Sequence, residues 1–550
     1  MKHKYIFISG GVISGLGKGI TTASLSLLLQ SSGYTVIPIK CENYLNIDAG
    51  TINPIEHGDP FLCEDGTEAD MDIGSYEKFL GRNMERMNFV TMGQIYKEVI
   101  EKERRFEYMG EDVQEVVHIT GEIIKRIREA LEKSGSQIAV IELGGTAGEY
   151  QNILYYEASR ILALKYPGDV IHVHVSYLPT PSHLGEPKTK PAQLSVRTVN
   201  SMGIQPDILV ARSEKPIDQR RKERLALFCN VSREDVISSY DVDTIYKIPL
   251  ILEKQHITKR VTSKIGLHFK TPQLSQWNNL ITTIKSPKKN KAKIAIVGKY
   301  FSTGEYQLRD SYAALFDAID HAAWRQSTEV ERLWIDAEDV ERNGVVKYIK
   351  GVDGIIVPIG WGSRGTEGMI QSASYARIHN IPYLGLCYGM QLAVVAFARD
   401  VLGYQDAHTT EVNPKTTYPV IHLMDTQISI MKRRAYGGTM RLGAWTALVK
   451  KNTHSWDIYK KYNWFINKKT GSTSERHRHR YEFNTSYASE FEKAGLIISA
   501  RSQRERLVEI IELPRSIHPF YIGTQGHPEY KSRPLVPHPL FLEFIGACIK

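Results

Sequence analysis

The chain has 550 residues, of which 42% are hydrophobic and 24% are charged, a composition typical of globular proteins. At about 150 residues per domain, this length predicts roughly two to four domains, whose cores need no disulfides. The modest net charge of +9 and the five scattered cysteines exclude extensive disorder and a disulfide scaffold, and they favour a reduced, intracellular setting.

An apolar run at residues 5–9 ends in glycines and predicts the first buried strand. This run is too short for a signal peptide, and no stretch of about 18 apolar residues predicts a transmembrane helix. We therefore expect a cytoplasmic protein with no membrane partner.

Apolar runs alternate with helical patterns through the first half of the chain. This alternation predicts a parallel sheet covered by helices on both faces. The further strands expected are 36–39, 138–141, 170–175 and 208–210, and the helices expected are 21–30 and 119–133.

The sequence changes near residue 285, where five lysines occur between Lys285 and Lys293. This segment is typical of a solvated linker rather than of a nucleic-acid patch. Strands at 294–298, 355–358 and 383–386 and a helix at 392–399 then follow. The sequence predicts two α/β domains, at 1–268 with a P-loop-like parallel sheet and at 293–550, joined by a linker at 269–292.

A glycine-rich turn follows the first strand and reads Gly10-Gly11-Val12-Ile13-Ser14-Gly15-Leu16-Gly17-Lys18-Gly19. Backbone N–H groups and a helix N-terminus can cradle phosphates there, and Lys18 can reach the β- and γ-phosphates. The turn departs from the P-loop pattern, because five residues separate Gly11 from Gly17 and Gly19 replaces Ser/Thr. A glycine turn without a ligand is the alternative, but the context favours nucleotide binding.

Acidic residues near such a turn are candidate magnesium ligands. Glu142 directly follows an apolar strand, where ligands of open α/β sheets gather. Asp72 follows an acidic stretch, and either carboxylate taken alone could be a solvated surface group. The cluster Lys188-Thr189-Lys190 suits phosphate oxygens or an ordinary exposed loop equally well.

Cys387 is the candidate nucleophile, because it lies in a Gly-x-Cys-x-Gly turn between an apolar strand and a helix. This is the layout of a nucleophile elbow, and the helix N-terminus favours the thiolate. His527 and Glu529, two residues apart, predict a base and the acid that orients it. The loop at 358–362 is the candidate source of backbone donors for an oxyanion.

Together these motifs resemble the CTP synthase family over nearly the whole chain. The first domain is similar to the family's amidoligase domain, and the second to class I glutamine amidotransferases. The resemblance implies that ATP phosphorylates O4 of UTP and that ammonia from glutamine displaces the phosphate, giving CTP, ADP, phosphate and glutamate. The runs that carry it are 10–14, 64–66, 144–146, 188–191, 203–207, 228–230, 245–249, 437–443 and 476–482.

The resemblance also implies residue roles. Cys387 would form a thioester with glutamine, with His527 as base and Glu529 orienting it, and Lys18 and Lys40 would serve phosphoryl transfer. The residues implied for magnesium are Asp72 and Glu142, and those for ATP are Ser14, Gly15, Leu16, Gly17, Lys18, Gly19, Ile20, Asp72, Asp241 and Val242. Those for UTP and CTP are Ser14, Glu149, Gln151, Lys188, Thr189, Lys190, Gln193 and Arg224, and those for glutamine are Gly360, Tyr388, Gln391, Glu411 and Arg480.

Regulation and assembly are implied in the same way. The family uses GTP, with Arg364 in the implied loop, to activate glutamine hydrolysis. CTP is a partner as product and feedback ligand. The family forms homotetramers, and some members form filaments.

Several residues depart from the family pattern. Glu149 and Gln151 replace an Asp and a Glu, Ala192 replaces a Thr, Arg224 replaces a Lys, Asp59 replaces a Glu, and Ile359 replaces a Gly. A β-branched residue is poorly tolerated where φ is positive, so the last change predicts impaired glutamine hydrolysis or a shifted loop.

Three other functions compete with this hypothesis. The changes in the nucleotide pocket motivate a paralogue that aminates a related pyrimidine nucleotide or resists CTP. A weakly catalytic filament or scaffold protein is disfavoured by the intact candidate residues. A nucleic-acid-binding ATPase is disfavoured because no aromatic platform accompanies the basic residues.

Overall fold

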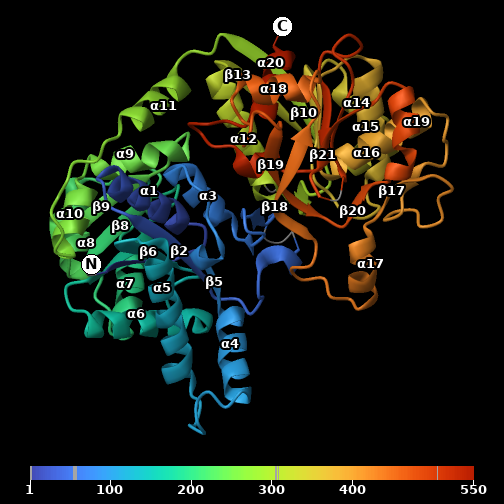
Figure 1. Ribbon diagram of the computed structural model, residues 1–550. Helices are drawn as coiled ribbons and strands as arrows, with labels where there is room; N and C mark the ends of the chain where they lie inside the picture. Colours follow the sequence, from blue (N-terminus) through green and yellow to red (C-terminus); the bar gives the residue numbers. More distant parts are fainter. Residues whose placement is uncertain (1–2, 54–57, 304–305, 308, 505, 550) are drawn as a thin grey trace. The chain divides into compact units, whose positions relative to one another are not determined.

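The computed structural model describes residues 3–53, 58–303, 306–307, 309–504 and 506–549. The chain forms two compact units (Figure 1). Unit 1 consists of Met1–Ile47 and Asp72–Ile281, and unit 2 of Asp48–Met71 and Thr282–Lys550. Residues 48–71 thus belong to unit 2, although they lie in the first half of the sequence. The domain boundaries expected from the change in sequence near residue 285 stay a prediction.

Unit 1 is built on a seven-stranded sheet whose pairings are all parallel. The strand order is β5-β2-β6-β1-β7-β8-β9. The strands are β1 (Lys4–Gly11), β2 (Val36–Glu42), β5 (Phe89–Thr91), β6 (Ile138–Leu143), β7 (Val170–Tyr177), β8 (Ile208–Ser213) and β9 (Val236–Tyr240). The helices are α1 (Lys18–Ser31), α3 (Met71–Leu80), α4 (Met92–Arg104), α5 (Thr120–Ser134), α6 (Ile153–Lys165), α7 (Lys190–Ser201), α8 (Gln219–Cys229), α9 (Ile248–Glu253), α10 (Ile257–Lys264) and α11 (Ser275–Lys285).

Alternation along β1 explains why both faces of this sheet are covered. Tyr5 and Phe7 join an apolar cluster with α5 and α6, whereas Ile6 and Ile8 join another with α1, α9 and α10. Successive side chains of a strand point to opposite faces, so an apolar run such as 5–8 needs a helical layer on each side. The expected parallel sheet is confirmed, and its strands extend beyond the apolar runs that predicted them.

Unit 2 contains a nine-stranded sheet in the order β13-β10-β14-β15-β23-β22-β21-β18-β19. Pairings are parallel from β13 to β23 and antiparallel from β23 to β19. Its strands are β10 (Asn290–Gly298), β13 (Thr328–Asp336), β14 (Gly354–Val357), β15 (Tyr383–Leu386), β18 (Arg441–Val449), β19 (Ser472–His479), β21 (Ile497–Ser502), β22 (Val508–Glu512) and β23 (Tyr521–Thr524). Smaller sheets contain β3 (Phe61–Leu62), β4 (Glu68–Ala69), β11 (Ser302–Thr303), β12 (Tyr306–Gln307), β16 (His408–Thr409), β17 (Pro419–Leu423) and β20 (Tyr481–Phe483).

The helices of unit 2 cover both faces of the large sheet. Ala295 and Val297 of β10 belong to one apolar cluster with α15 and α16, and Ile294 and Ile296 to another with α12 and α20. The second α/β unit is therefore confirmed. The helices are α12 (Ala313–Arg325), α13 (Ala337–Asn343), α14 (Val345–Ile349), α15 (Thr366–Ile378), α16 (Tyr388–Asp400), α17 (Asp425–Lys432), α18 (His454–Lys461), α19 (Ala488–Lys493) and α20 (Pro539–Cys548).

The lysine-rich segment is more regular than the linker expected from sequence. Helix α11 ends at Lys285, and β10 begins at Asn290, so only a short connection separates them. Trp277 of α11 is buried against Phe79 and Tyr246, and its indole N–H donates to the Tyr246 carbonyl over 2.7 Å. The lysines do remain at the surface, but the apolar side of α11 makes it part of the fold.

Replacement of Trp277 by Ala tests this packing. We expect W277A to lower the free energy of unfolding of unit 1 by about 3–5 kcal/mol, because it removes a buried aromatic side chain. Denaturant unfolding measures the change, and exposed Gln276 on the same helix provides the matched control Q276A, expected within about 0.5 kcal/mol of wild type. Equal effects of the two substitutions would show that α11 is a detached linker.

Candidate active sites

The phosphate loop lies between the end of β1 and the start of α1. Gly15 and Gly17 have φ of 69° and 96°, which explains the glycines at these positions. Val12 has φ of 84°, a conformation that costs a β-branched residue on the order of 1–3 kcal/mol. Lys18 is buried, and its Nζ donates to the Gly145 carbonyl over 2.6 Å. The loop therefore combines backbone strain with a fixed lysine, as phosphate-binding turns do.

Gly19, the departure from the P-loop pattern, has a steric explanation. A Cβ at this position would lie 1.8 Å from Oδ1 of Asp72. The carboxylate thus occupies the space in which a P-loop Ser/Thr would place its hydroxyl. Because that hydroxyl is a magnesium ligand in P-loops, Asp72 is well placed to substitute for it.

Lys40, at the end of β2, is the centre of a carboxylate cluster in unit 1. Its Nζ lies 2.6 Å from Asp72, 2.8 Å from Glu142 and 3.2 Å from Glu42. Tyr76 donates a hydrogen bond to the second oxygen of Glu142. Burial and the charge of Asp72 raise the pKa of Glu142, while Lys40 and Lys18 oppose the shift. The structure thus brings together four residues expected from sequence: Lys18, Lys40, Asp72 and Glu142.

Two of these carboxylates fit a magnesium ion. Asp72 and Glu142 converge on one cation, the Lys40 ammonium. Two carboxylates completed by phosphate oxygens and water form a common magnesium environment. Among the described residues, no group of three or more His, Cys, Asp and Glu side chains is arranged to hold a metal.

The expected pyrimidine-nucleotide residues lie in two places in unit 1. Glu149 accepts hydrogen bonds from the Thr146 N–H over 3.0 Å and from Asn43 over 3.3 Å, and Asn43 also reaches Gln151 over 3.5 Å. At α7, Gln193 donates to Thr189 over 3.1 Å. Glu149 has a side chain one methylene longer than that of the Asp it replaces, and its carboxylate accepts the Thr146 N–H within this turn.

Other expected residues have partners of their own. Lys188 pairs with Glu186 over 2.6 Å, and Arg224 lies over the Phe228 ring, 6.0 Å from its centroid. Asp241, just after β9, pairs with Arg212. Ala192 is fully buried in an apolar cluster, which explains why it is not a threonine. Ser14 and Gly15 are exposed at the loop, Lys190 is exposed on α7, and Leu16, Ile20 and Val242 pack on the core beneath the loop.

A buried histidine joins the phosphate loop to α7. His174 Nδ1 lies 2.9 Å from the Ser9 hydroxyl, and its Nε2 lies 2.7 Å from the Ser195 hydroxyl. Burial lowers the pKa of His174 to about 3, so the ring is neutral at ordinary pH. A Cβ on Gly11 would lie 1.5 Å from Ser195 Oγ, which shows how closely helix and loop approach. The sequence reasoning missed this link, although His174 lies in a predicted strand.

The candidate nucleophile of unit 2 has the strained backbone of a nucleophile elbow. Cys387 has φ of 52° and ψ of −99° at the N-cap of α16. A Cβ at Gly389 would lie 1.9 Å from the Val357 carbonyl oxygen, and one at Gly385 2.8 Å from Gly389. The flanking glycines are therefore required by close backbone contacts, as the sequence pattern predicted. The turn presents the Cys387 thiol to the end of β23.

His527 and Glu529 form the expected pair. His527 Nδ1 lies 2.7 Å from Glu529 Oε1, and both side chains are buried. The ring also interacts with the Cys387 side chain. Burial opposes protonation, but the charges of Glu529 and Cys387 outweigh it and raise the pKa of His527 to about 10. A protonated histidine beside a cysteine is typical of activated cysteine nucleophiles.

The candidate oxyanion loop lies against the residue that follows the nucleophile. A Cβ at Gly360 would lie 3.2 Å from the Tyr388 ring, and the Tyr388 hydroxyl donates to the Gly362 carbonyl over 3.1 Å. Ile359 is buried, its carbonyl accepts from Tyr312 over 3.2 Å, and it is not among the residues with positive φ. The condition under which Ile359 would strain the loop is therefore not met.

Lys299 holds this loop through hydrogen bonds to its carbonyl groups. The sequence analysis did not identify this residue. Its Nζ donates to the carbonyls of Trp361 over 3.2 Å and Gly362 over 2.5 Å and lies 4.5 Å from the Tyr388 ring centroid. Burial lowers the pKa of Lys299 to about 8. Because Lys299 directly follows β10, the rule that ligands gather at strand ends could have identified it.

Three of the expected glutamine-binding residues, Gln391, Glu411 and Arg480, interact with Tyr481. Gln391 donates to the Tyr481 carbonyl over 2.8 Å, and the charges of Glu411 and Arg480 both act on the Tyr481 hydroxyl. Glu411 accepts from the Gly362 N–H over 2.8 Å, and burial raises its pKa. Arg480 donates to the Tyr436 carbonyl over 2.7 Å. The charges of a carboxylate and a guanidinium thus act on one tyrosine.

Successive side chains of β19 point to opposite faces, so the strand carries two separate groups of charged contacts. On one side, Arg478 lies 2.6 Å from Glu68 and 3.3 Å from Asp59, and Arg476 lies 2.9 Å from Glu64. These contacts hold residues 48–71 within unit 2. Tyr530, three residues after His527, also donates to Asp59 over 2.7 Å.

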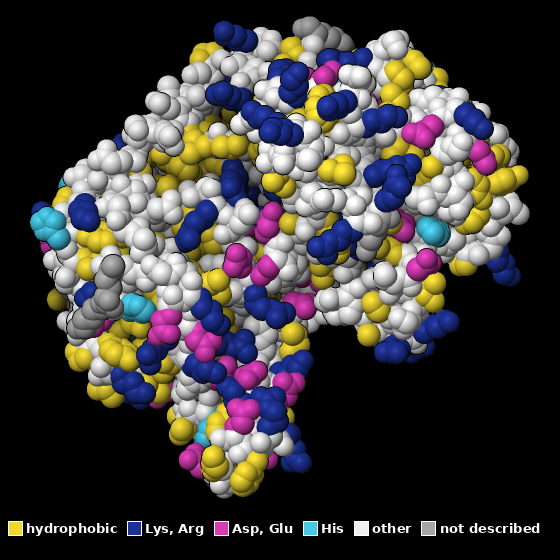
Figure 2. Space-filling view, viewed as in Figure 1, with side chains coloured by type: hydrophobic (Ala, Val, Ile, Leu, Met, Phe, Trp, Pro, Cys, Tyr) yellow, Lys and Arg dark blue, Asp and Glu magenta, His cyan; other side chains and the backbone are white. Residues whose placement is uncertain are grey.

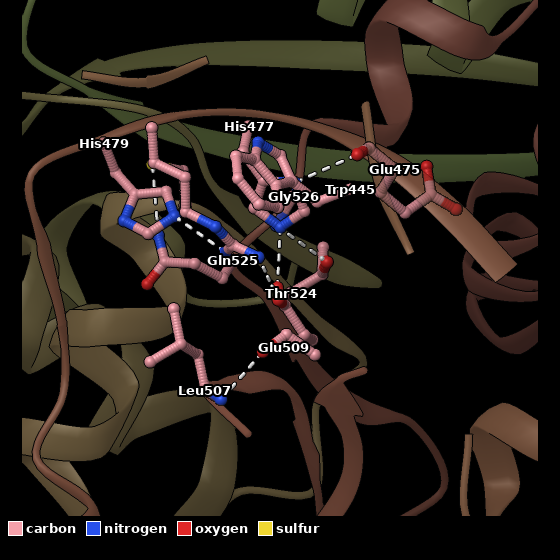
Figure 3. A network of polar contacts seen from close by, with 12 residues as sticks. Trp445, Glu475, His477, His479, Leu507, Glu509, Thr524, Gln525 and Gly526 are labelled. Atoms are coloured by element: carbon pink, nitrogen blue, oxygen red, sulfur yellow. Dashed lines mark hydrogen bonds and ion pairs between the residues drawn. The ribbon is translucent and has the colours of Figure 1, made fainter. Parts of the chain in front are cut away.

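On the other side of β19, Glu509 lies 2.6 Å from both His477 and Arg441. Figure 3 shows His477, His479 and Glu509 near Thr524, Gln525 and Gly526, the residues that lead to His527. The Gln525 N–H donates to the Glu509 carbonyl over 2.8 Å. The buried ion pairs thus support the backbone that carries the candidate base.

Two family models match this chain. The model described as the CTP synthase N-terminus matches residues 4–267, and that of class-I glutamine amidotransferases matches residues 307–547. These matches and the two sites define a ligase joined to a glutamine amidotransferase.

Curated relatives make the assignment specific. A CTP synthase of Sulfolobus acidocaldarius is 46% identical over 544 residues, 99% of each chain. One of Pyrococcus abyssi is 46% identical over 546 residues, 99% of this chain and 97% of the relative. One of Hydrogenobaculum sp. is 44% identical over 543 residues, 98% of this chain and 97% of the relative. The chain belongs to the CTP synthase family.

A solved structure is also similar. The glutaminase domain of Trypanosoma brucei CTPS with bound acivicin is 35% identical, with a TM-score of 0.41. The match covers 47% of this chain and 93% of that domain.

Substitution of Gly19 by Ser tests the position of Asp72. We expect G19S to slow ammonium-dependent CTP formation about 10–100-fold, because the new Cβ displaces the carboxylate from the Lys40 cluster. A steady-state assay measures the rate. Gly121 faces open space on α5, so G121A is the matched control and should retain the wild-type rate. Unchanged activity of G19S would contradict the role of Asp72.

The pH dependence of glutamine hydrolysis tests the His527–Glu529 pair. Because the pKa of His527 is raised to about 10, the imidazolium persists below that pH and is lost as pH rises through it. E529Q removes a charge that raises this pKa, so we expect the alkaline limb of the pH–rate profile to move to lower pH and the rate to fall about 100-fold. E492Q, at a half-exposed glutamate, should leave the profile unchanged. An alkaline limb that stays in place in E529Q would refute this coupling.

Proposed function

We propose that the protein is a glutamine-dependent CTP synthase, which aminates UTP at the expense of ATP. Family membership along the whole chain supports this function. The observation that carries it is one chain holding both a phosphate loop with a Lys40–Asp72–Glu142 cluster and a Cys387–His527–Glu529 triad. No observation favours a paralogue with another substrate, a scaffold protein or a nucleic-acid-binding ATPase.

In the ligase reaction, positively charged groups neutralise the phosphate oxygens. Lys18 and Lys40 lie where they can neutralise the oxygens of the transferred phosphoryl group. Asp72 and Glu142 would hold Mg²⁺, which neutralises ATP phosphates when bound. The remaining phosphate-loop residues, with Asp241 and Val242, bind ATP.

The UTP and CTP site combines charge with hydrogen-bonding groups. Lys188, Lys190 and Arg224 provide charge for a nucleoside triphosphate, while Thr189 and Gln193 provide hydrogen-bonding groups at the start of α7. Glu149 and Gln151 add acceptors beside Asn43. A triphosphate would draw Lys188 away from its present partner, Glu186.

In the glutaminase reaction, Cys387 attacks the side-chain amide carbon of glutamine. A C–S bond forms, the C–N bond breaks, and His527 gives its proton to the departing ammonia. Water then cleaves the thioester to glutamate. Backbone N–H groups of the 358–362 loop and of Tyr388 stabilise the oxyanion. The opposite charges of Glu411 and Arg480 suit the α-ammonium and α-carboxylate of the substrate.

Regulation by nucleotides belongs to the same proposal. GTP activates glutamine hydrolysis through Arg364, whose guanidinium contacts the Lys299 carbonyl and lies 3.3 Å from Glu338. Movement of Arg364 would therefore reach the oxyanion loop through Lys299. CTP inhibits at the site that binds UTP.

Assembly into homotetramers, and from these into filaments, is supported by exposed apolar side chains. Phe106 and Met109, 67% and 82% exposed, lie at the tip of the α4–α5 hairpin together with Val116 and Val117 (Figure 2). Leu227 on α8 is 78% exposed. Apolar patches of this kind are typical of subunit contacts.

We also propose a cytoplasmic location and no nucleic-acid partner. Within the described residues, every helix is too short or too polar to cross a bilayer. The substrates proposed here are cytoplasmic metabolites, which is the basis for this location.

The function is tested by following conversion of UTP to CTP with ATP and Mg²⁺, with ammonium in one reaction and glutamine plus GTP in the other. We expect wild type to convert UTP in both reactions. C387A should retain the ammonium reaction within about twofold and lose the glutamine reaction, because only the latter needs the thiolate. Failure of wild type in both reactions would contradict the proposal. Failure with glutamine alone would confine a defect to glutamine hydrolysis, to its activation or to ammonia transfer.

A further inference from the structure

Gln525 is a buried residue that contacts the candidate nucleophile directly. It follows β23, is fully buried, and its Nε2 lies 3.4 Å from the Cys387 sulfur. The sulfur also lies 3.9 Å from the Arg478 carbonyl, to which only a thiol proton can donate, and it interacts with the His527 ring. Gln525 is therefore a hydrogen-bond donor to this sulfur, and none of the roles described above uses it.

The orientation of the Gln525 amide is fixed by a chain of hydrogen bonds. Gln391 Nε2 donates to the Tyr481 carbonyl over 2.8 Å, and the carbonyl cannot donate, so the Gln391 amide group has one possible orientation. The same Nε2 donates to Gln525 Oε1 over 3.1 Å. Gln525 must then present its N–H groups, and not its oxygen, to the Cys387 sulfur.

We infer that Gln525 is a catalytic hydrogen-bond donor that stabilises the Cys387 thiolate and aims the sulfur at the glutamine amide. This inference rests on the proposed role of Cys387 as nucleophile. An N–H donor favours the thiolate over the thiol, because only the anion is a strong acceptor. As the C–S bond forms, negative charge moves from sulfur to the amide oxygen, where the backbone donors take over.

His527 and Gln525 have different roles in this proposal. His527 Nε2 keeps the proton that it later gives to ammonia, whereas Gln525 retains its N–H throughout. His527 thus acts by proton transfer to the leaving ammonia, and Gln525 acts by a fixed hydrogen bond to the sulfur.

The test compares two substitutions of similar shape. Q525M removes the donor and retains the volume, and Q525E presents a carboxylate oxygen to the sulfur. Alkylation of Cys387 by iodoacetamide, followed against pH, reports the thiolate directly and needs no glutamine turnover. We expect the midpoint of the alkylation profile to move to higher pH by about one unit in Q525M and further in Q525E. We expect glutamine hydrolysis at neutral pH to fall about 10-fold and 100-fold, respectively.

Controls separate this role from a structural one. Exposed Gln405 provides the matched variant Q405M, which should have the wild-type profile. Thermal unfolding shows whether Q525M is folded. If it is not, the alkylation profile of Q525E or of Q525N tests the inference instead. Ammonium-dependent CTP formation should stay at the wild-type rate in every folded variant.

A double-mutant cycle tests the orientation argument. Q391M removes the hydrogen bond that orients the Gln525 amide, so we expect it to shift the alkylation profile less than Q525M does. The double variant should shift the profile no more than Q525M alone. A wild-type profile in both Q525M and Q525E would overturn the inference. So would lost hydrolysis with an unmoved profile, since Gln525 would then act on the substrate. A wild-type enzyme that hydrolyses no glutamine would instead contradict the proposed function.

Discussion

The buried ion pairs of Arg478 are the constraint on which the glutaminase half of the molecule depends. Arg478, Glu68 and Asp59 are all buried, and Tyr530 also donates to Asp59. Loss of one member would leave a charge without compensation, which typically costs about 3–5 kcal/mol. The same residue contributes its carbonyl beside the Cys387 sulfur, so the fold and the geometry of the nucleophile are fixed by one side chain and its backbone.

Strain and rigidity occur together at both sites. Cys387 and Val12 both have positive φ, a conformation that only a well-packed surrounding maintains. Around Cys387 the packing consists of backbone atoms that leave no room for a Cβ at two neighbouring glycines. Around Val12 it consists of α7, which approaches Gly11 through Ser195. In each case close contacts leave no room for a side chain at a glycine beside the strained residue.

Sequence reasoning succeeded where one local pattern determines one local structure. The strand–turn–helix around Lys18 and the elbow around Cys387 are such cases, because glycine spacing and apolar runs act over a few residues. The His527–Glu529 pair was accessible for the same reason. The roles assigned to individual residues by resemblance remain predictions.

The sequence did not reveal interactions between distant segments. The reason for Gly19 is the position of Asp72, and the function of Lys299 depends on a loop some sixty residues later. Helix α11 was not predicted, because the lysines that follow it are typical of an exposed linker. The one strong sign of a buried face in this segment is Trp277. The concern about Ile359 assumed a positive φ that the backbone does not have. Such features depend on tertiary contacts, which periodicity and composition do not encode.

The membership of residues 48–71 in unit 2 has a topological consequence. The chain passes from one unit to the other at 47–48, at 71–72 and at 281–282, so three covalent connections join the units rather than one. A protease that cuts only the last connection leaves the halves linked through the other two. For the same reason, a single continuous fragment that contains all of unit 2 also contains the intervening part of unit 1. The first connection begins five residues after β2, which carries Lys40, and the second leads directly into Asp72. Tension on the inserted segment would therefore be transmitted along the backbone to both flanks of the carboxylate cluster.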